Sequence, residues 1–212
     1  MKAVLAVPLL LASTLSGCVT GKMDYTKPSP VAKQTFNSVV LGRPVDEAWK
    51  SSVAKLSTQY FVINNMDRSS GLINLSYSGD PEQFVDCGTI TSDVSNARGP
   101  RSYRFPASRA KQQYEFAEGG NLFVNDRTMN MEGRINLLLQ AETETTTKAT
   151  VNARYVLTKT IHTRQYGGGQ GNFTDSAAFN TGQTGVFSPG SATEVTCVPT
   201  GKLEDDILSA LQ

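Results

Sequence analysis

The stretch Thr128 to Thr163, TMNMEGRINLLLQAETETTTKATVNARYVLTKTIHT, carries the strongest structural signal in the chain. Apolar residues or glycine alternate with polar neighbours on both sides of ETETTTK (142–148), and Leu138 interrupts the pattern in the first half. An alternation with a period of two is typical of a strand with one buried and one solvated face. The stretch therefore predicts one long antiparallel hairpin, with strands over 128–141 and 149–163.

Two segments with helical spacing lie toward the ends of the chain. Pro44 suits the first turn of a helix, and Thr200 is the expected cap of the second segment. The apolar positions at helical spacing are Val45, Ala48, Trp49, Val53 and Leu56 in the first segment and Leu203, Ile207, Leu208 and Leu211 in the second. Both segments predict amphipathic helices, each with one face to bury against a sheet.

Shorter strands complete the expected fold. They are runs of β-forming residues bounded by turn residues. The expected short strands are 61–63, 72–78, 112–116, 122–124 and 193–198. Because strands dominate the middle and a helix lies toward each end, the chain predicts a single α+β domain over 36–212. We expect an antiparallel sheet covered on one face by the N-terminal and the C-terminal helix.

The first eighteen residues have the organisation of an export signal. A membrane-spanning helix needs about 20 apolar residues, more than the run Ala3 to Leu15 contains. LSGC at 15–18 resembles the lipobox of bacterial lipoproteins, in which the cysteine is acylated and the preceding peptide is removed. The resemblance implies a signal peptide at 1–17 and acyl chains on Cys18. The alternative is an ordinary secretory signal that contains an unmodified cysteine.

The residues after Cys18 extend this interpretation. Lipoproteins retained in the inner membrane of many Gram-negative bacteria carry Asp at the position of Val19. The resemblance therefore implies the outer membrane, with the protein facing the periplasm. Stable anchoring needs more than one acyl chain. Residues 18–35 contain Gly, Pro and Ser without an apolar period, which favours a flexible lipidated tether.

The chain contains three cysteines. If Cys18 carries lipid, Cys87 and Cys197 are left as a pair, and the oxidising envelope allows them to bond. Two free thiols or a metal site are the competing interpretations. A metal site would need further ligands, and His162 is the only histidine. We therefore expect a disulfide between Cys87 and Cys197.

Residues 165–191 change in character. GGG at 167–169 is followed by Asn, Ser, Thr and further Gly, with few large side chains. Such a segment buries too little apolar surface to offset the entropy cost of ordering it. Phe173, Phe179 and Phe187 are spaced through it. The sequence predicts either a mobile loop or a segment that orders on a partner.

A basic stretch precedes the second predicted hairpin. Two hypotheses are open for it: contact with phosphorylated lipid headgroups or an acidic partner, and a solvated loop, which is the usual state of a charge run. The candidate contact residues are Arg98, Arg101, Tyr103, Arg104, Arg109 and Lys111.

No set of residues indicates catalysis. His162 has no Ser or Cys in a recognised nucleophile setting, and Glu142 and Glu144 lie in a predicted turn, where carboxylates are solvated. GGGQG at 167–171 lacks the Lys and Ser/Thr of a phosphate-binding loop, and 80–86 lacks calcium-loop spacing. The formal net charge of +1 does not indicate a nucleic-acid-binding tract. We expect no enzyme activity, no metal and no cofactor.

The segment RPVDEAWKSSVAKLSTQYFVINNMDRSSGLINLSYS (43–78) resembles the opening of helix-grip modules in BamC-type lipoproteins of the outer-membrane β-barrel assembly machinery. The matching residues are Pro44, Trp49, Asp67, Ser70, Gly71, Leu72 and Ile73. The resemblance implies a lipid-tethered module that binds protein or peptide and performs no chemistry. This chain contains one such module, whereas BamC-type lipoproteins have two.

Together, these features predict a lipid-anchored, non-catalytic lipoprotein that acts as a scaffold or accessory subunit of an envelope complex. Its expected partners are the outer membrane, through the acyl chains on Cys18, and an envelope protein, but no nucleic acid. The alternative is a carrier that binds a small apolar ligand or lipid in a cleft between helix and sheet.

Overall fold

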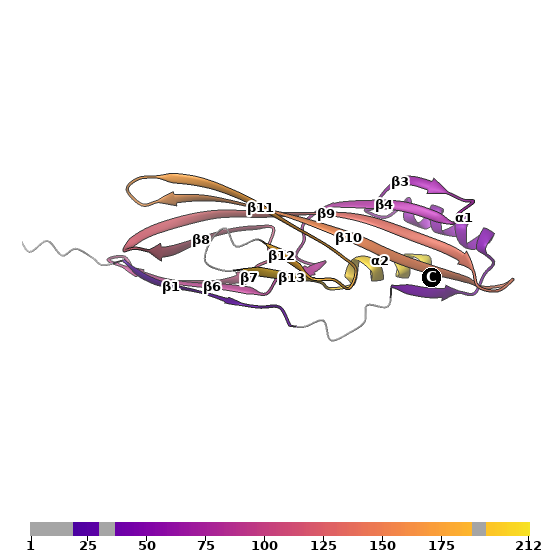
Figure 1. The fold of residues 1–212 in the computed structure, drawn as a ribbon, viewed down its shortest axis with the longest axis horizontal. Helices are drawn as coiled ribbons and strands as arrows, with labels where there is room; N and C mark the ends of the chain where they lie inside the picture. Colours follow the sequence, from indigo (N-terminus) through magenta and orange to yellow (C-terminus); the bar gives the residue numbers. More distant parts are fainter. Residues whose placement is uncertain (1–18, 30–36, 188–193) are drawn as a thin grey trace, which may run out of the picture.

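The structure is a computed structural model of the 212-residue chain that describes residues 19–29, 37–187 and 194–212. It is mostly β, with antiparallel sheets, and its long strands run along the long axis of the molecule (Figure 1). The elements are β1 (Thr20–Thr26), β2 (Ser38–Leu41), α1 (Val45–Leu56), β3 (Val62–Asp67), β4 (Leu72–Gly79), β5 (Val85–Asp86), β6 (Thr89–Asn96), β7 (Gly99–Pro106), β8 (Lys111–Glu118), β9 (Asn121–Ala141), β10 (Thr147–Gln165), β11 (Gln170–Asn180), β12 (Gly185–Phe187), β13 (Val195–Pro199) and α2 (Lys202–Leu211).

The predicted long hairpin is confirmed as β9 and β10. Their register runs without a break from Thr147 opposite Ala141 to Gln165 opposite Phe123, so β9 begins earlier in the chain than predicted. Side chains alternate between buried and exposed along most of both strands. The alternation that marked this stretch therefore reflects one face turned toward the core and one toward solvent.

Each half of this hairpin has different neighbours. In one half, β4 and β3 extend the sheet beyond β9, and β2 pairs with β10. In the other half, β8 pairs with β9 and β11 pairs with β10. Strands β9 and β10 are thus shared by two parts of the molecule, which we call the helix half and the cavity half.

The helix half is covered by α1 and α2, which contact each other and the sheet. Leu203 of α2 lies over Gly133 of β9, where an added Cβ would be 3.2 Å from the leucine side chain. The buried carboxylate of Glu204 accepts hydrogen bonds from Tyr155 Oη at 2.7 Å and Thr181 Oγ1 at 2.6 Å. Buried side chains therefore fill the interface between helices and sheet. Neither helix in the described ranges is long and apolar enough to cross a membrane.

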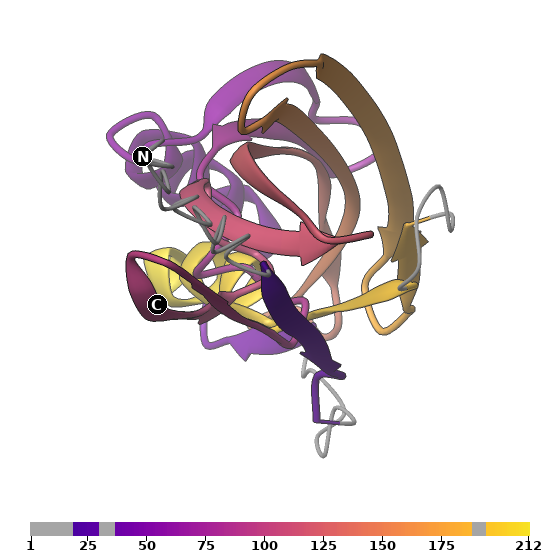
Figure 2. The same ribbon diagram turned by 90° about the vertical axis from the view of Figure 1, so that its left-hand side faces the viewer.

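The cavity half is covered by two small sheets. One contains β1, β6 and β7, and the other contains β12, β13 and β5. Viewed along the long axis, β1 lies across the molecule from the curved strands β10 and β11 (Figure 2). The single sheet covered by helices that the sequence predicted is therefore present in the helix half only, because additional strands cover the rest of the hairpin.

The predicted tether is wrong for residues 20–26, which form β1. This strand pairs with β6 from Thr20 opposite Ser95 to Thr26 opposite Thr89. The Tyr25 hydroxyl accepts a hydrogen bond from Thr196 N at 2.9 Å and lies 3.1 Å from Cys87 O. The segment is polar and short, so its order comes from pairing with β6 and not from an apolar pattern of its own. Residues 30–35 of the predicted tether lie outside the described residues.

The prediction for the glycine-rich segment also needs correction. Residues 170–180 form β11, which pairs with β10 along its whole length. Alternate side chains, including Phe173, Ala177 and Phe179, point toward the core. The composition argument failed because the edge of β10 supplies backbone hydrogen-bond partners that an isolated polar segment lacks. Residues 188–191 lie outside the described residues.

Candidate functional site: a cationic cavity between the sheets

Two of the three cysteines lie in the described residues. Cys87, directly after β5, and Cys197 in β13 form the expected disulfide, across a sequence separation of 110 residues. Both are fully buried. The predicted lipidation site, Cys18, lies outside the described residues, two positions before β1.

The predicted basic contact region is not a single loop: it consists of the β6–β7 turn, β7, the β7–β8 turn and the first residue of β8, and its side chains make separate contacts. Arg101 and Tyr103 both contact the half-buried carboxylate of Glu115, Arg101 through Nε and Tyr103 at 3.2 Å. Hydrogen bonding to Glu115 raises the pKa of Arg101, while burial raises that of Tyr103. These two residues are therefore engaged within the protein.

The remaining members of the set are also separated. Arg98 donates a hydrogen bond to Tyr166 Oη at 2.6 Å, and Arg109 lies 3.5 Å from a Glu82 carboxylate oxygen. Arg104 and Lys111 are exposed and lie on different strands. The six predicted residues do not form one continuous cationic patch.

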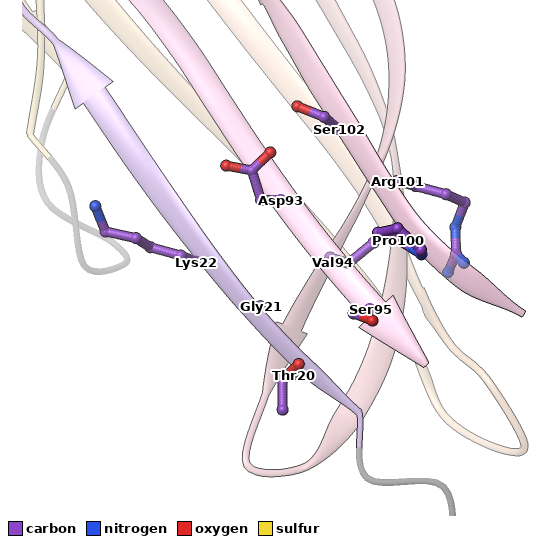
Figure 3. A pocket seen from close by; sticks show the side chains of 9 residues that line it. All are labelled: Thr20, Gly21, Lys22, Asp93, Val94, Ser95, Pro100, Arg101 and Ser102. Carbon is purple, nitrogen blue, oxygen red and sulfur yellow. The ribbon is translucent and has the colours of Figure 1, made fainter. Parts of the chain in front are cut away.

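A shallow depression of about 590 Å³ lies at one end of β1, β6 and β7 (Figure 3). Its charges are mixed, since Lys22, Asp93 and Arg101 all line it. Arg101 and Ser102 are neighbours in β7, and their side chains extend to opposite sides of the strand. Because it is open and holds both signs of charge, this depression does not select a charged ligand.

A smaller cavity of about 60 Å³ lies inside the cavity half. Water needs about 10–15 Å³ of such space, so the cavity has room for a few waters or a small chemical group. Side chains from six strands converge on it. Its lining residues are Met23, Asp24, Tyr25, Ile90, Tyr114, Arg127, Lys159, Ile161 and Val195.

Arg127 in β9 is the first of two cations in this cavity. Its side chain is deeply buried, at 2% exposure, and donates to the backbone oxygens of Ala107 and, at 3.0 Å, Arg109. Burial lowers the pKa of Arg127 to about 10, so the guanidinium stays charged at neutral pH. A guanidinium has five N–H donors, and these two carbonyls satisfy only part of that set.

Lys159 in β10 is the second cation. It is 9% exposed, and its Nζ lies 4.4 Å from the ring centre of Phe187 and 5.7 Å from that of Phe173. Both distances allow a cation–π attraction. Arg127 pairs with Ile161, two residues beyond Lys159, so the two cations are diagonal neighbours on one face. Burial and then repulsion by Arg127 lower the pKa of Lys159.

The carboxylates do not balance this charge. None lies within 4.0 Å of Arg127 or Lys159 among the described residues, which contain every Asp and Glu of the chain. Asp175 is opposite Lys159 in register, and its attraction opposes the lowering of the lysine pKa. Asp24 at the rim pairs instead with Lys22 at 2.8 Å. The cavity therefore holds two cations against one nearby carboxylate.

A polar side-chain network adds a further donor. Thr163 Oγ1 donates to Asn125 at 2.6 Å, and Asn125 Nδ2 donates to the Tyr114 hydroxyl at 2.9 Å. Tyr114 is 4% exposed and lines the cavity. Because its oxygen already accepts this bond, the Tyr114 O–H is directed to an acceptor other than Asn125.

Sequence reasoning did not identify Arg127, Lys159 or Tyr114 as site residues. Lys159 continues the inward positions of its strand, so extending the alternation beyond Leu157 would have placed a lysine on the buried face. Arg127 occupies the same face of β9. That signal could have marked both cations as inward-facing, but not that strands from elsewhere in the chain enclose them.

The candidate catalytic residues considered in the sequence lie apart. His162 Nδ1 is 2.6 Å from Asn172 Oδ1, and Glu142 and Glu144 are exposed in the β9–β10 turn. Within the described ranges, no group of three or more His, Cys, Asp or Glu residues could hold a metal ion. No family model, curated protein or solved structure matches this chain.

Proposed function

We propose that this protein is a lipid-anchored, non-catalytic lipoprotein of the outer membrane that faces the periplasm and acts as a scaffold or accessory subunit of an envelope complex. The observation that carries the proposal is LSGC at 15–18, followed two residues after Cys18 by the docked strand β1. The Cys87–Cys197 disulfide is consistent with an oxidising compartment.

The position of β1 adds an orientation to the proposal. Two residues span at most about 7 Å, so an acylated Cys18 keeps the Thr20 end of β1 at the bilayer surface. Gly21 packs against Ala117 of β8, which places the β8–β9 turn beside that end. The helices lie at the opposite end of the molecule (Figure 1). The helix half is thus directed away from the membrane, toward partners.

We also propose that the helix half is a helix-grip-like module with the architecture of an α+β unit. Residues 43–78, which carry the resemblance to BamC-type modules, form α1, β3 and β4 there. This module and its exposed helix surface are the part of the protein that we expect to bind a protein or peptide.

The chemical basis of the proposal can be tested by mass spectrometry of the mature protein. We expect an N-terminal Cys18 that carries acyl chains and a product that lacks residues 1–17. The same protein should fractionate with the outer membrane. An unmodified Cys18 thiol, or cleavage at another position, would contradict the anchor and with it the proposed location.

The orientation can be tested with spin labels at two exposed charged positions, Glu118 at the end of β8 and Lys50 on α1. On the lipidated protein in vesicles, the label at 118 should contact the headgroup region and the label at 50 should not. A control variant carries a 20-residue Gly/Ser insert before Thr20, which spans about 25 Å. In that variant the contact at 118 should be lost. Equal contact at both sites in the parent protein would contradict the orientation.

The carrier alternative depends on an apolar ligand between helix and sheet. In this structure Leu203, Ile207 and Leu211 of α2 are buried in that interface. The scaffold proposal is therefore favoured. Native mass spectrometry that detects a retained apolar ligand would favour the carrier instead.

A further inference from the structure

We propose that the cavity between the sheets is a binding site for the carboxylate group of a small organic monoanion. The carboxylate would sit between the Lys159 ammonium, the remaining N–H donors of Arg127 and the Tyr114 hydroxyl. This inference concerns a different part of the molecule from Cys18 and does not rest on the proposed anchor.

Charge balance is the first argument. Buried charges in proteins are paired or neutralised, because removing an ion from water is costly. Arg127 and Lys159 are buried diagonal neighbours, and Asp175 is opposite Lys159 in register. The other nearby carboxylate, Asp24 at the rim, pairs with Lys22. One positive charge is left over, and a bound anion with a single negative charge would balance it.

Donor geometry is the second argument. Arg127 donates to the carbonyls of Ala107 and Arg109, which lie in the turn before β8. These two acceptors use only part of the five N–H donors of the guanidinium. Lys159 Nζ makes ring contacts but has no hydrogen-bond acceptor among the described residues. The Tyr114 hydroxyl accepts from Asn125 Nδ2 and donates no hydrogen bond to any described residue. Three side chains from three strands thus offer unused donors to one enclosed space.

The size and walls of the cavity identify the class of anion. About 60 Å³ accommodates a carboxylate and a short carbon chain, but not a large ligand. Met23, Ile90, Ile161 and Val195 supply apolar wall next to the donors. A phosphate monoester carries close to two negative charges at neutral pH, which would exceed the single unbalanced charge. We therefore assign a short-chain monocarboxylate.

The binding test is calorimetric titration of the purified protein with sodium butyrate at pH 7 and constant ionic strength, with phosphate and chloride as comparison anions. We expect saturable binding of butyrate, and weaker binding of phosphate and chloride. Lys159→Met should reduce the butyrate affinity by at least about tenfold, which corresponds to the loss of one charge-assisted hydrogen bond. Lys148→Met, which removes an exposed cation from the same strand, should bind as the parent does.

Two further variants separate a ligand site from a structural arrangement of charges. Tyr114→Phe keeps the ring but removes the hydroxyl, which is both the proposed donor and the acceptor of the Asn125 amide, and should weaken butyrate binding by about two- to tenfold. Asp175→Asn removes the competing carboxylate beside Lys159 and should tighten binding. If Lys159 and Asp175 only stabilise each other, Asp175→Asn would lower thermal stability without tightening binding.

Several results would overturn the proposal. These are the absence of saturable butyrate binding, binding of chloride or phosphate as tight as that of butyrate, and unchanged affinity in Lys159→Met. Circular dichroism and thermal unfolding of each variant show whether it is folded, so a loss of affinity in a folded Lys159→Met protein is assigned to the site.

Discussion

The two halves of the β9–β10 hairpin share the same strands but bury different chemistry. In the helix half, the inward side chains include Ile135, Leu137 and Val151, and two helices cover them. In the cavity half, the inward positions of the same strands include Arg127 and Lys159, and small sheets cover them. One continuous face therefore changes from apolar to cationic along its length.

The layer that covers the hairpin determines whether its inward face becomes core or lines a cavity. The amphipathic helices bring apolar side chains into continuous contact with the sheet, so side chains fill the interior of the helix half. The cavity half is covered by strands β1, β6, β8 and β13, which leave between them a space lined by two cations and by apolar side chains. Side chains at equivalent positions of one strand thus become core in one half and site in the other.

The largest expected effect on stability comes from removing the Cys87–Cys197 disulfide, which lies in the small sheet of β12, β13 and β5 that covers the cavity half. A double variant, Cys87→Ser with Cys197→Ser, opens a loop of 110 residues, which in the chain-entropy model removes about 4–5 kcal/mol of unfolding free energy. Urea unfolding would measure this loss of unfolding free energy. The parent protein unfolded in a reducing agent, which also breaks the disulfide, should show a similar loss. Hydrogen exchange should rise in β13 and β1 more than in α1 and α2, and a uniform rise would contradict a stabilising effect of the disulfide that is specific to the cavity half.

In the helix half, Leu137→Ala should be the most damaging single truncation in β9. Leu137 is fully buried, so loss of its side chain leaves a cavity and should cost about 2–5 kcal/mol of unfolding free energy. Leu138→Ala is the matched control, since Leu138 is only half-buried on the other face of the same strand. Equal destabilisation by the two variants in urea unfolding would contradict the assignment of faces.

Tyr155→Phe tests a buried polar contact in the helix half. The change removes a donor to the buried Glu204 carboxylate, which would keep only the bond from Thr181, and should cost about 1–3 kcal/mol. Tyr166→Phe is the control, because Tyr166 is exposed at the β10–β11 turn. Thermal unfolding should show a clearly lower midpoint for the first variant and little change for the second.

The smallest effect, and one of opposite sign, is expected in the cavity half. Lys159→Met removes a buried cation without an ion pair and should leave the unfolding free energy unchanged or raise it by about 1 kcal/mol at pH 7. The changes in unfolding free energy caused by Leu137→Ala and Lys159→Met would then have opposite signs, although both residues face inward on neighbouring strands.

The effect of Lys159→Met should depend on pH in a defined direction. The pKa of Lys159 in the folded protein lies below its ordinary value of 10.5, so the charged form costs stability below the folded-state pKa. This cost disappears as the pH rises from the lowered pKa to 10.5. The stability difference between variant and parent should therefore shrink in alkali. A difference that grows with pH would show that Lys159 stabilises the fold as a cation.

Several features could be predicted from local sequence. The long hairpin, α1, the apolar face of α2 and strand β4 follow from periodicity, because these segments carry their own apolar face. Strand β3 has no buried side chain and extends to Asp67, beyond the predicted 61–63. The Cys87–Cys197 bridge followed from counting cysteines and from the expected compartment. Each of these predictions depends on side chains whose environment follows from their chemistry: apolar side chains are buried, and cysteines in an oxidising compartment form disulfides.

Other features were decided only by the tertiary structure. Strands β1 and β11 are too polar to indicate strands, and they are ordered because β6 and β10 offer open edges with unpaired backbone groups. The cavity forms because residues as distant as Met23 and Val195 enclose Arg127 and Lys159. The sequence by itself determined which residues share a face of a strand or helix. The environment of that face was decided by the packing of segments remote in the chain, because burial depends on all the surrounding layers and not on a local pattern.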